Sequence, residues 1–253
     1  MLGFALVAVA VLACAVGCAP AENAVKKPAA SQSVTPAPSV TPSPSATVAE
    51  FDKTRLSIDD PNSIWIVGNK LRQLSPANYA PTDLVTVKVH YISNPLMRAE
   101  AAAALETMFA ASVAEGAGEL QIQNAYRSYN VQVRVHDSWV ARIGQAKADA
   151  QSARPGYSEH QTGLTLDITS RPETCSIQAC FGQTPQGQWL AANAYRFGYI
   201  LRYPADKTPI TGYIYEPWHF RYVGVELATE MHDTGVTTLE EFFGLPPAPD
   251  YAP

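Results

Sequence analysis

One segment near the N-terminus confines the folded part of this chain to the residues that follow it. Residues 19–50 are mainly Ala, Ser, Thr, Val and Pro, as in SVTPAPSVTPSPSAT, and show no hydrophobic periodicity. This composition is typical of a disordered, semi-extended linker. At about 3 Å per residue in polyproline geometry, about thirty such residues reach up to about 90 Å. We therefore expect a globular region within residues 51–253.

The size and charge of the chain limit its class. With 253 residues, 47% hydrophobic content and a mean hydropathy of −0.08, it is long enough for one sizeable core or two small ones. The net charge of −5 and the isoelectric point near 5.5 leave no broad basic surface. We therefore expect no nucleic-acid partner.

The first eighteen residues resemble an export signal. Residues 2–16 are small and apolar, and they lead directly into Gly-Cys-Ala-Pro, which resembles a lipobox ending at Cys18. This apolar run is short for a spanning helix but suits a signal peptide, although no Lys or Arg precedes Lys26. An uncleaved membrane anchor is the alternative. Lipidation of Cys18 would anchor an exported protein to the outer face of a bacterial membrane, and otherwise the protein would be secreted.

Two cysteines remain outside the predicted signal peptide, Cys175 and Cys180 in CSIQAC. Export to an oxidising compartment makes a short-loop disulfide the simplest prediction. A zinc-binding pair is the alternative, but this region has no further cysteine to complete a thiolate site.

Hydrophobic spacing predicts a mixture of helices and strands. Asn94 and Pro95 look like the start of a helix whose apolar stripe ends before Gly116. Residues 119–127 and 215–223 have strand patterns. Residues 128–147 predict a helix with its apolar face at Val131, Val135 and Ile143, and residues 187–197 predict another. A last helix at about 225–233 precedes a polar tail, so one α+β domain is expected.

The stretch SEHQTGLTLDI places a histidine seven residues before an aspartate. Alternation in LTLDIT puts Leu164, Leu166 and Ile168 on one strand face and Asp167 on the other. A straight strand would hold His160 more than about 20 Å away from Asp167. A turn at Thr162-Gly163 would bring the two together, and an unrelated surface pair is the alternative.

A second cluster, YEPWHFRYV, holds Glu216 and His219. Pro217 argues against a helical Glu-x-x-His pair, whereas the alternation from Trp218 onward is strand-like. A turn at Pro217 would place Glu216 and His219 over one site. The alternative is a buried aromatic strand with one hydrogen-bonded histidine.

Taken together, SEHQTGLTLD and EPWH resemble the zinc-dependent D-alanyl-D-alanine carboxypeptidases of the VanY type, a group related to the vancomycin-resistance dipeptidases and the hedgehog zinc fold. The family pattern is Ser-x-His-x-x-Gly-x-Ala-x-Asp followed by Glu-x-x-His, and Thr165 replaces its alanine. The likeness extends through AYRSYNVQ and GNKLRQLSPANYAPTDLV, and it spans Ile66 to the last helix. It implies a single catalytic domain at 51–253, with a central antiparallel sheet flanked by helices.

The resemblance also implies roles for individual residues. It assigns one Zn²⁺ ion, ligands at His160, Asp167 and His219, and the general base to Glu216; this division suits a metal that activates water beside a carboxylate. Arg127 would stabilise the oxyanion, because a guanidinium stays charged and offers a planar fork of donors. Contacts to the substrate or its pocket are predicted for three further residues, Ser158, Gln132 and Ser128. The remaining histidines are expected to be structural or exposed: His90, His136 and His232.

The leading hypothesis is an exported zinc carboxypeptidase that removes the terminal D-alanine of peptidoglycan stem peptides. A close alternative keeps the same zinc site but cuts another bond, as an L,D-carboxypeptidase or a cross-link endopeptidase. A third hypothesis is a non-catalytic, zinc-stabilised lipoprotein that binds the cell wall. The presence of Glu216 argues against this third hypothesis, because a structural zinc site needs no base.

Overall fold

A computed structural model describes residues 50–252 of the chain. The predicted signal peptide, Cys18 and almost all of the predicted linker lie outside these residues, so they stay predictions. The strands are β1 (Leu84–Thr86), β2 (Leu96–Arg98), β3 (Glu119–Asn124), β4 (Thr165–Arg171), β5 (Tyr199–Leu201) and β6 (His219–Tyr222). The α-helices are α1 (Ala99–Ala114), α2 (Tyr129–Ile143), α3 (Gln145–Asp149), α4 (Pro185–Asn193), α5 (Thr208–Thr211), α6 (Val225–Thr234) and α7 (Leu239–Phe243). Short 3₁₀ helices are η1 (Glu159–Thr162), η2 (Ala179–Gln183) and η3 (Ala194–Phe197).

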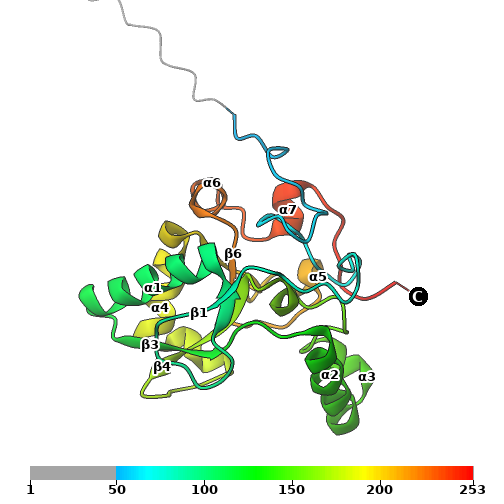
Figure 1. The fold of residues 1–253 in the computed structure, drawn as a ribbon, viewed down its shortest axis with the longest axis horizontal. Coiled ribbons are helices and arrows are strands. Elements are labelled where there is room, and N and C mark those ends of the chain that lie inside the picture. Colours follow the sequence, from blue (N-terminus) through cyan, green and yellow to red (C-terminus); the bar gives the residue numbers. More distant parts are fainter. Residues whose placement is uncertain (1–49, 253) are drawn as a thin grey trace, which may run out of the picture. The chain divides into compact units, whose positions relative to one another are not determined.

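The main sheet has four strands in the order β3-β4-β6-β5, and every neighbouring pair is antiparallel. Strands β1 and β2 form a separate two-stranded ribbon. Helices α1 and α4 lie together on one side, and α2 and α3 form a pair that projects away from α6 and α7 (Figure 1). The predicted α+β class with an antiparallel sheet flanked by helices is confirmed.

The two faces of the main sheet differ in chemistry. Because side chains alternate along a strand, Leu166 and Ile168 of β4 and Phe220 and Tyr222 of β6 all join the larger hydrophobic core. Helix α1 covers this core with Ala101, Ala102, Leu105, Met108 and Phe109. The opposite face carries polar residues at the positions between, and they are buried as well.

A second, smaller core lies beside the polar face and corrects one prediction. The segment expected to be a polar tail contains α7, whose Leu239 and Phe242 pack with Trp65 and with Leu227 and Met231 of α6. Thr238 caps α7, because its side chain accepts a hydrogen bond from the Glu241 N–H. Charged residues on a five-residue helix concealed its apolar contacts in the sequence.

Two helix predictions were wrong in detail. Helix α1 begins at Ala99, because Asn94 and Pro95 precede β2 and take no part in the helix. The single helix expected over residues 128–147 is divided at Gly144 (φ 80°) into α2 and α3, and α2 buries Gln132 and His136 while leaving Val131 36% exposed. Its neighbour is the polar segment around Ser152, whose carbonyl oxygen contacts His136 Nδ1, so hydrogen bonding and not apolar contact selects the buried face.

Cys175 and Cys180 are joined in a disulfide, as predicted. Within residues 50–252, we find no helix that is long and apolar enough to cross a membrane.

Candidate metal centre and active site

Two of the predicted ligands are brought together by strand register. Asp167 in β4 lies directly opposite His219 in β6, so both side chains project from the same polar face. The Oδ1 atom of Asp167 lies 3.4 Å from His219 Nδ1. Both residues are buried, with exposed fractions of 7% and 5%. The sequence pattern had assigned each to a strand, but only pairing of the strands makes them neighbours.

His160 reaches the same point through the predicted turn. It lies in η1, which ends at Gly163 in the left-handed region (φ 70°) before β4 begins. This positive φ angle favours glycine, because a residue with a Cβ atom is strained in the left-handed region. His160 Nε2 lies 3.4 Å from Asp167 Oδ2. The turn prediction is therefore confirmed.

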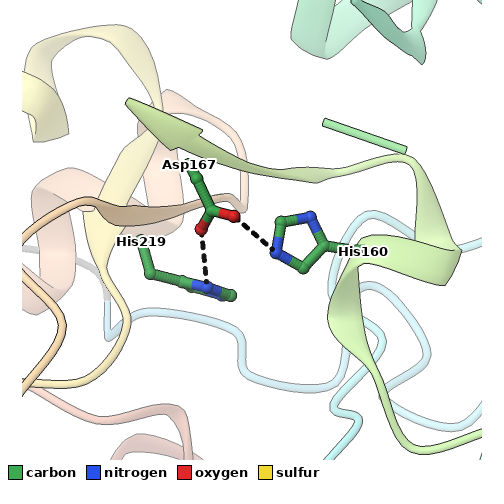
Figure 2. A group of neighbouring side chains, drawn as sticks. All are labelled: His160, Asp167 and His219. Carbon is green, nitrogen blue, oxygen red and sulfur yellow. Dashed lines mark ion pairs between the residues drawn. The ribbon is translucent and has the colours of Figure 1, made fainter. Parts of the chain in front are cut away.

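The three side chains fit a zinc ion. Figure 2 shows Asp167 between the two histidines, with one carboxylate oxygen directed at each ring. One ligand atom from each residue lies within 4.8 Å of the others. Two ligands about 2.1 Å from a tetrahedral zinc are about 3.4 Å apart. Each histidine lies at this separation from one of the two Asp167 oxygens. Two imidazoles and one carboxylate also leave a fourth position, as catalytic zinc sites do.

Charge in this cluster is strongly coupled. Burial would raise the pKa of the Asp167 carboxyl, but His160 and His219 hold it well below its usual range. Burial would lower the pKa of His219, but Asp167 and Glu159 raise it to about 9. Neighbouring carboxylates therefore hold positive charge at this point, as a metal-binding site requires.

Glu216 lies beside the three predicted ligands and is not part of the group that could hold a metal ion. A turn at Pro217 is closed by a 3.0 Å hydrogen bond from the His219 N–H to the Glu216 carbonyl oxygen. This turn places Glu216 Oε2 3.5 Å from His219 Nδ1. Burial raises the pKa of the Glu216 carboxyl to about 8, although His219 and Arg127 act in the opposite direction. A carboxyl with a raised pKa can both take and return a proton near neutral pH.

Arg127 follows β3 and extends toward the same carboxylate. Its Nη2 lies 3.8 Å from Asp167 Oδ2, and its Nη1 donates a 2.9 Å hydrogen bond to Gln132 Oε1. Gln132 is fully buried and donates in turn to Ser152 Oγ and the Ala153 carbonyl oxygen. The guanidinium is therefore held with part of its fork free to face a developing negative charge.

These residues line one cavity of about 370 Å³. Arg127, Ser158, His160, Glu216 and His219 are among its lining residues, together with Asp167. Aromatic and loop residues complete the walls: Trp139, Tyr203, Tyr213, Tyr215, Trp218 and the disulfide-loop residues Ile177, Gln178 and Ala179.

Two predicted substrate contacts are not among the lining residues. Gln132 accepts a hydrogen bond from Arg127 and does not line the cavity itself. Ser128 caps α2, because its hydroxyl oxygen accepts a 3.4 Å hydrogen bond from the Val131 N–H. Their contact with substrate stays a prediction. The remaining histidines lie outside the ligand group: His136 contacts Asp149, His232 stacks on Tyr195, and His90 is exposed.

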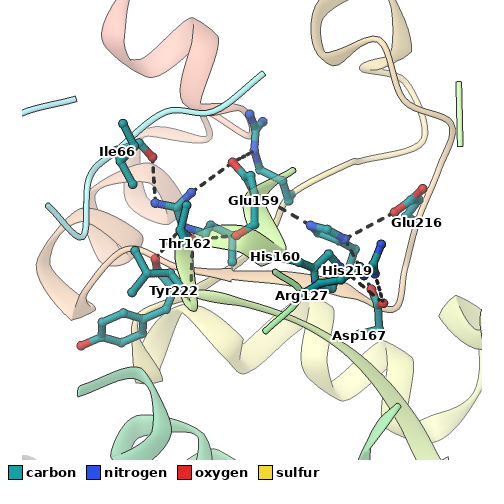
Figure 3. Close-up of polar contacts among 12 residues, drawn as sticks. Ile66, Arg127, Glu159, His160, Thr162, Asp167, Glu216, His219 and Tyr222 are labelled. Atoms are coloured by element: carbon teal, nitrogen blue, oxygen red, sulfur yellow. Dashed lines mark hydrogen bonds and ion pairs between the residues drawn. The ribbon is translucent and has the colours of Figure 1, made fainter. Parts of the chain in front are cut away.

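Sequence reasoning missed a buried ion network behind His219. Figure 3 shows Glu159 beside the His219 ring. Glu159, next to His160 in the sequence, accepts hydrogen bonds from Arg202 and Arg221, and Arg202 also donates two hydrogen bonds to Glu240 of α7. The side chains of these four residues are fully buried. Burial would raise the pKa of Glu159, but the two arginines hold it well below its usual range. One available signal was an arginine within each of the aromatic, strand-like stretches YILRY and HFRYV.

The chain is similar to known proteins over much of its length. The family model described as VanY, D-alanyl-D-alanine carboxypeptidase, matches residues 94–225, which are 132 of the 253 residues. YodJ of Bacillus subtilis strain 168 is 45% identical over 192 residues, a match that covers 74% of this chain and 69% of YodJ.

Two solved structures are similar in fold as well as in sequence. The LdcB LD-carboxypeptidase has a TM-score of 0.67 at 44% identity, over 73% of this chain and 87% of LdcB. A mutant of the vancomycin-resistance D,D-pentapeptidase VanY from the VanB-type cassette, solved in complex with Zn(II), has a TM-score of 0.60 at 33% identity. That match covers 72% of this chain and 98% of the VanY chain.

Proposed function

Because this peptidase belongs to the VanY family of D-alanyl-D-alanine carboxypeptidases, we propose that it uses one zinc ion to remove the C-terminal D-alanine of peptidoglycan stem peptides. The strongest support is the convergence of His160, Asp167 and His219 with Glu216 and Arg127 in one cavity. Zinc held by the first three residues would supply a Lewis acid, which activates water near neutral pH and polarises a carbonyl.

Each of the other groups has one task in this proposal. Glu216 takes a proton from the attacking water and later returns it to the leaving amine of D-alanine. Arg127 stabilises the negative charge that develops on the scissile carbonyl oxygen. Ser158, buried to 4% exposure at the cavity wall, offers a hydroxyl to the peptide. Aromatic walls exclude water around the reacting bond.

A second candidate activity keeps this chemistry and changes the bond. LdcB is named an LD-carboxypeptidase, and it has a higher identity to this chain than the VanY structure, at 44% against 33%. An L,D-carboxypeptidase would shorten the tetrapeptide stem and leave the pentapeptide intact. The same zinc site would also serve an endopeptidase acting on cross-links.

Product analysis distinguishes these activities. The zinc-loaded protein is incubated with a pentapeptide stem, a tetrapeptide stem and a cross-linked dimer, and the products are identified by mass spectrometry. We expect release of D-alanine from the pentapeptide, loss of release with EDTA, and recovery on addition of zinc. Preference for the tetrapeptide would refute the D,D assignment, and release that persists in EDTA would refute the metal mechanism.

The proposed cellular location rests on sequence alone. The apolar segment before Cys18 supports export, with either a lipid anchor at Cys18 or secretion. Labelling of cells with a radioactive fatty acid, compared between the native chain and Cys18→Ser, tests the anchor. A label that is retained in Cys18→Ser would exclude lipidation at this residue.

A further inference from the structure

The two predicted histidine ligands differ in what contacts the ring nitrogen facing away from Asp167. His160 Nδ1 lies 2.7 Å from the Ala125 carbonyl oxygen, a direct hydrogen bond. His219 Nε2 is buried and has no hydrogen-bond partner among residues 50–252. Glu159 Oε2 lies 3.9 Å from it, and that oxygen too lacks a hydrogen-bond partner within the same residues. Two unsatisfied buried polar atoms thus face each other.

The arginines leave this carboxylate oxygen free. Arg202 Nε and Arg221 Nη1 both donate to Glu159 Oε1, at 2.9 Å and 3.1 Å. Neither donates to Oε2, which is directed at His219 (Figure 3). The carboxylate is therefore divided between two tasks, with one oxygen held by the cations and the other available to the histidine.

We infer that Glu159 is a positioning residue for the metal site: its Oε2 accepts the Nε2 proton of His219 and keeps the Nδ1 lone pair available to zinc. A neutral imidazole carries one proton, so a hydrogen bond at one nitrogen decides which nitrogen can bind metal. Carboxylates commonly hold metal-binding histidines in this way. The inference rests on the proposed use of zinc.

The surrounding ion network stabilises a carboxylate whose side chain has no solvent exposure. A buried anion is very costly unless it is paired and hydrogen-bonded. Arg202 is itself held by Glu240 through hydrogen bonds of 2.9 Å and 2.8 Å, and Arg221 Nη2 donates to the carbonyl oxygens of Ile64 and Ile66. The arginines thus fix Glu159 through Oε1 alone, and its Oε2 lies toward the His219 ring.

Replacing the carboxylate by its amide tests the assignment. In Glu159→Gln the amide oxygen stays with the two arginines, so the NH₂ group faces His219 Nε2. The NH₂ group donates a hydrogen bond to Nε2, and this favours the tautomer of His219 with its proton on Nδ1. A protonated Nδ1 has no lone pair to offer to zinc. We expect the zinc dissociation constant, measured by competition with a chromogenic chelator, to rise about 10–100-fold.

The matched control is Glu240→Gln, which removes a charge from the same network but does not contact His219. We expect this control to melt at a lower temperature and to bind zinc with unchanged affinity. If Glu159→Gln folds and binds zinc as tightly as the native protein, the carboxylate has a structural role alone and the inference is wrong.

A measurement on the native protein covers the case in which Glu159→Gln does not fold. Nitrogen-15 NMR of the zinc-loaded protein should show His219 protonated at Nε2, with slow exchange of that proton because Glu159 holds it. Zinc at Nε2, or rapid exchange of the Nε2 proton, would overturn the inference. Absence of zinc binding in the native protein would overturn the proposed function together with it, whereas the other outcomes leave that function intact.

Discussion

The polar face of the sheet has two halves that use the same residue types in opposite ways. One half contains Glu159, Arg202, Arg221 and Glu240, whose charges are joined by hydrogen bonds of 2.8–3.1 Å in full burial. In the other half, around Asp167, the nearest arginine contact is the 3.8 Å ion pair with Arg127, and the residues line a cavity.

This difference separates stability from chemistry. Paired charges in the first half satisfy one another, so Arg202 joins the end of β5 to helix α7 through Glu240, and Arg221 joins β6 to η1 through Glu159. Charges in the second half are less tightly paired, and in the proposed mechanism each binds something brought from solution: a cation at Asp167, a proton at Glu216 and an oxyanion at Arg127. His219 is the boundary, because one ring nitrogen faces each half.

The largest effect is expected in the cavity half, from Glu216→Gln. Loss of the general base should lower the turnover of D-alanine release by about 10²–10⁴-fold, whereas zinc content should not change because Glu216 is not in the ligand group. Product assays and metal analysis measure the two separately. Glu226→Gln, at an exposed residue of α6, is the matched control. Full activity of Glu216→Gln would show that Glu216 is not the general base.

In the buried half, Glu240→Gln should act on stability. Leaving Arg202 without this partner should cost about 3–5 kcal/mol at pH 7. Burial would raise the pKa of Glu240, but Arg202 lowers it overall. Because the folded-state pKa is depressed, this stability is present above the unfolded pKa of about 4.3 and is lost as pH falls. Urea unfolding at pH 7 and in acid should therefore show the variant and the native protein converging in acid.

A constant difference between Glu240→Gln and the native protein at both pH values would show that packing, and not charge, stabilises the buried half. The exposed pair Arg196 and Glu115 offers a reference, since solvent screens this pair and Glu115→Gln should change stability much less than Glu240→Gln does.

Arg127→Lys should also act in the cavity half, with a somewhat smaller effect. Lysine keeps the positive charge but loses the planar fork and the contact with Gln132 Oε1. We expect kcat/KM to fall by about 10²–10³-fold while the melting temperature stays near that of the native protein. Arg134→Lys, at an exposed position of α2, is the control. If Arg127→Lys lowers the melting temperature as strongly as it lowers kcat/KM, Arg127 has a structural role like that of the buried arginines.

The smallest effect should come from the disulfide loop. Ile177 is 39% exposed and lines the cavity, so Ile177→Ala removes apolar surface from the cavity wall. We expect KM to rise about fivefold, or about 1 kcal/mol, with kcat unchanged. Ile92→Ala, which is 44% exposed and does not line the cavity, should change neither value. A change in kcat would indicate that the loop acts on the reacting bond.

Local patterns predicted the cavity half well. The alternation in LTLDIT assigned Asp167 to the polar strand face, and Thr162-Gly163 and Pro217 marked the turns that bring His160 and Glu216 to it. These signals depend on neighbouring residues, so a single sequence carries them. The pairing of Asp167 with His219 depends on strand register, which the structure alone shows; the resemblance to a family had implied only that both residues are ligands.

The buried half could not be predicted in the same way. Glu159 finds Arg202 and Arg221 at separations of 43 and 62 residues, and Arg202 finds Glu240 at 38. No periodicity connects positions so far apart in the sequence. Charged residues are rarely fully buried, so no local pattern gave a reason to expect these four in the interior. The buried face of α2 was missed for the same reason, since Gln132 and His136 are polar.

The link between Glu240 and Arg202 also orders events in time. A chain is synthesised from its N-terminus, so His160, Asp167 and His219 are all made before Glu240. Until α7 emerges, Arg202 lacks the carboxylate that binds it through two hydrogen bonds, and the ion network behind His219 is incomplete. Completion of this ion network therefore waits for almost the whole catalytic domain, and a chain that ends before α7 would lack part of its buried charge pairing while keeping His160, Asp167 and His219.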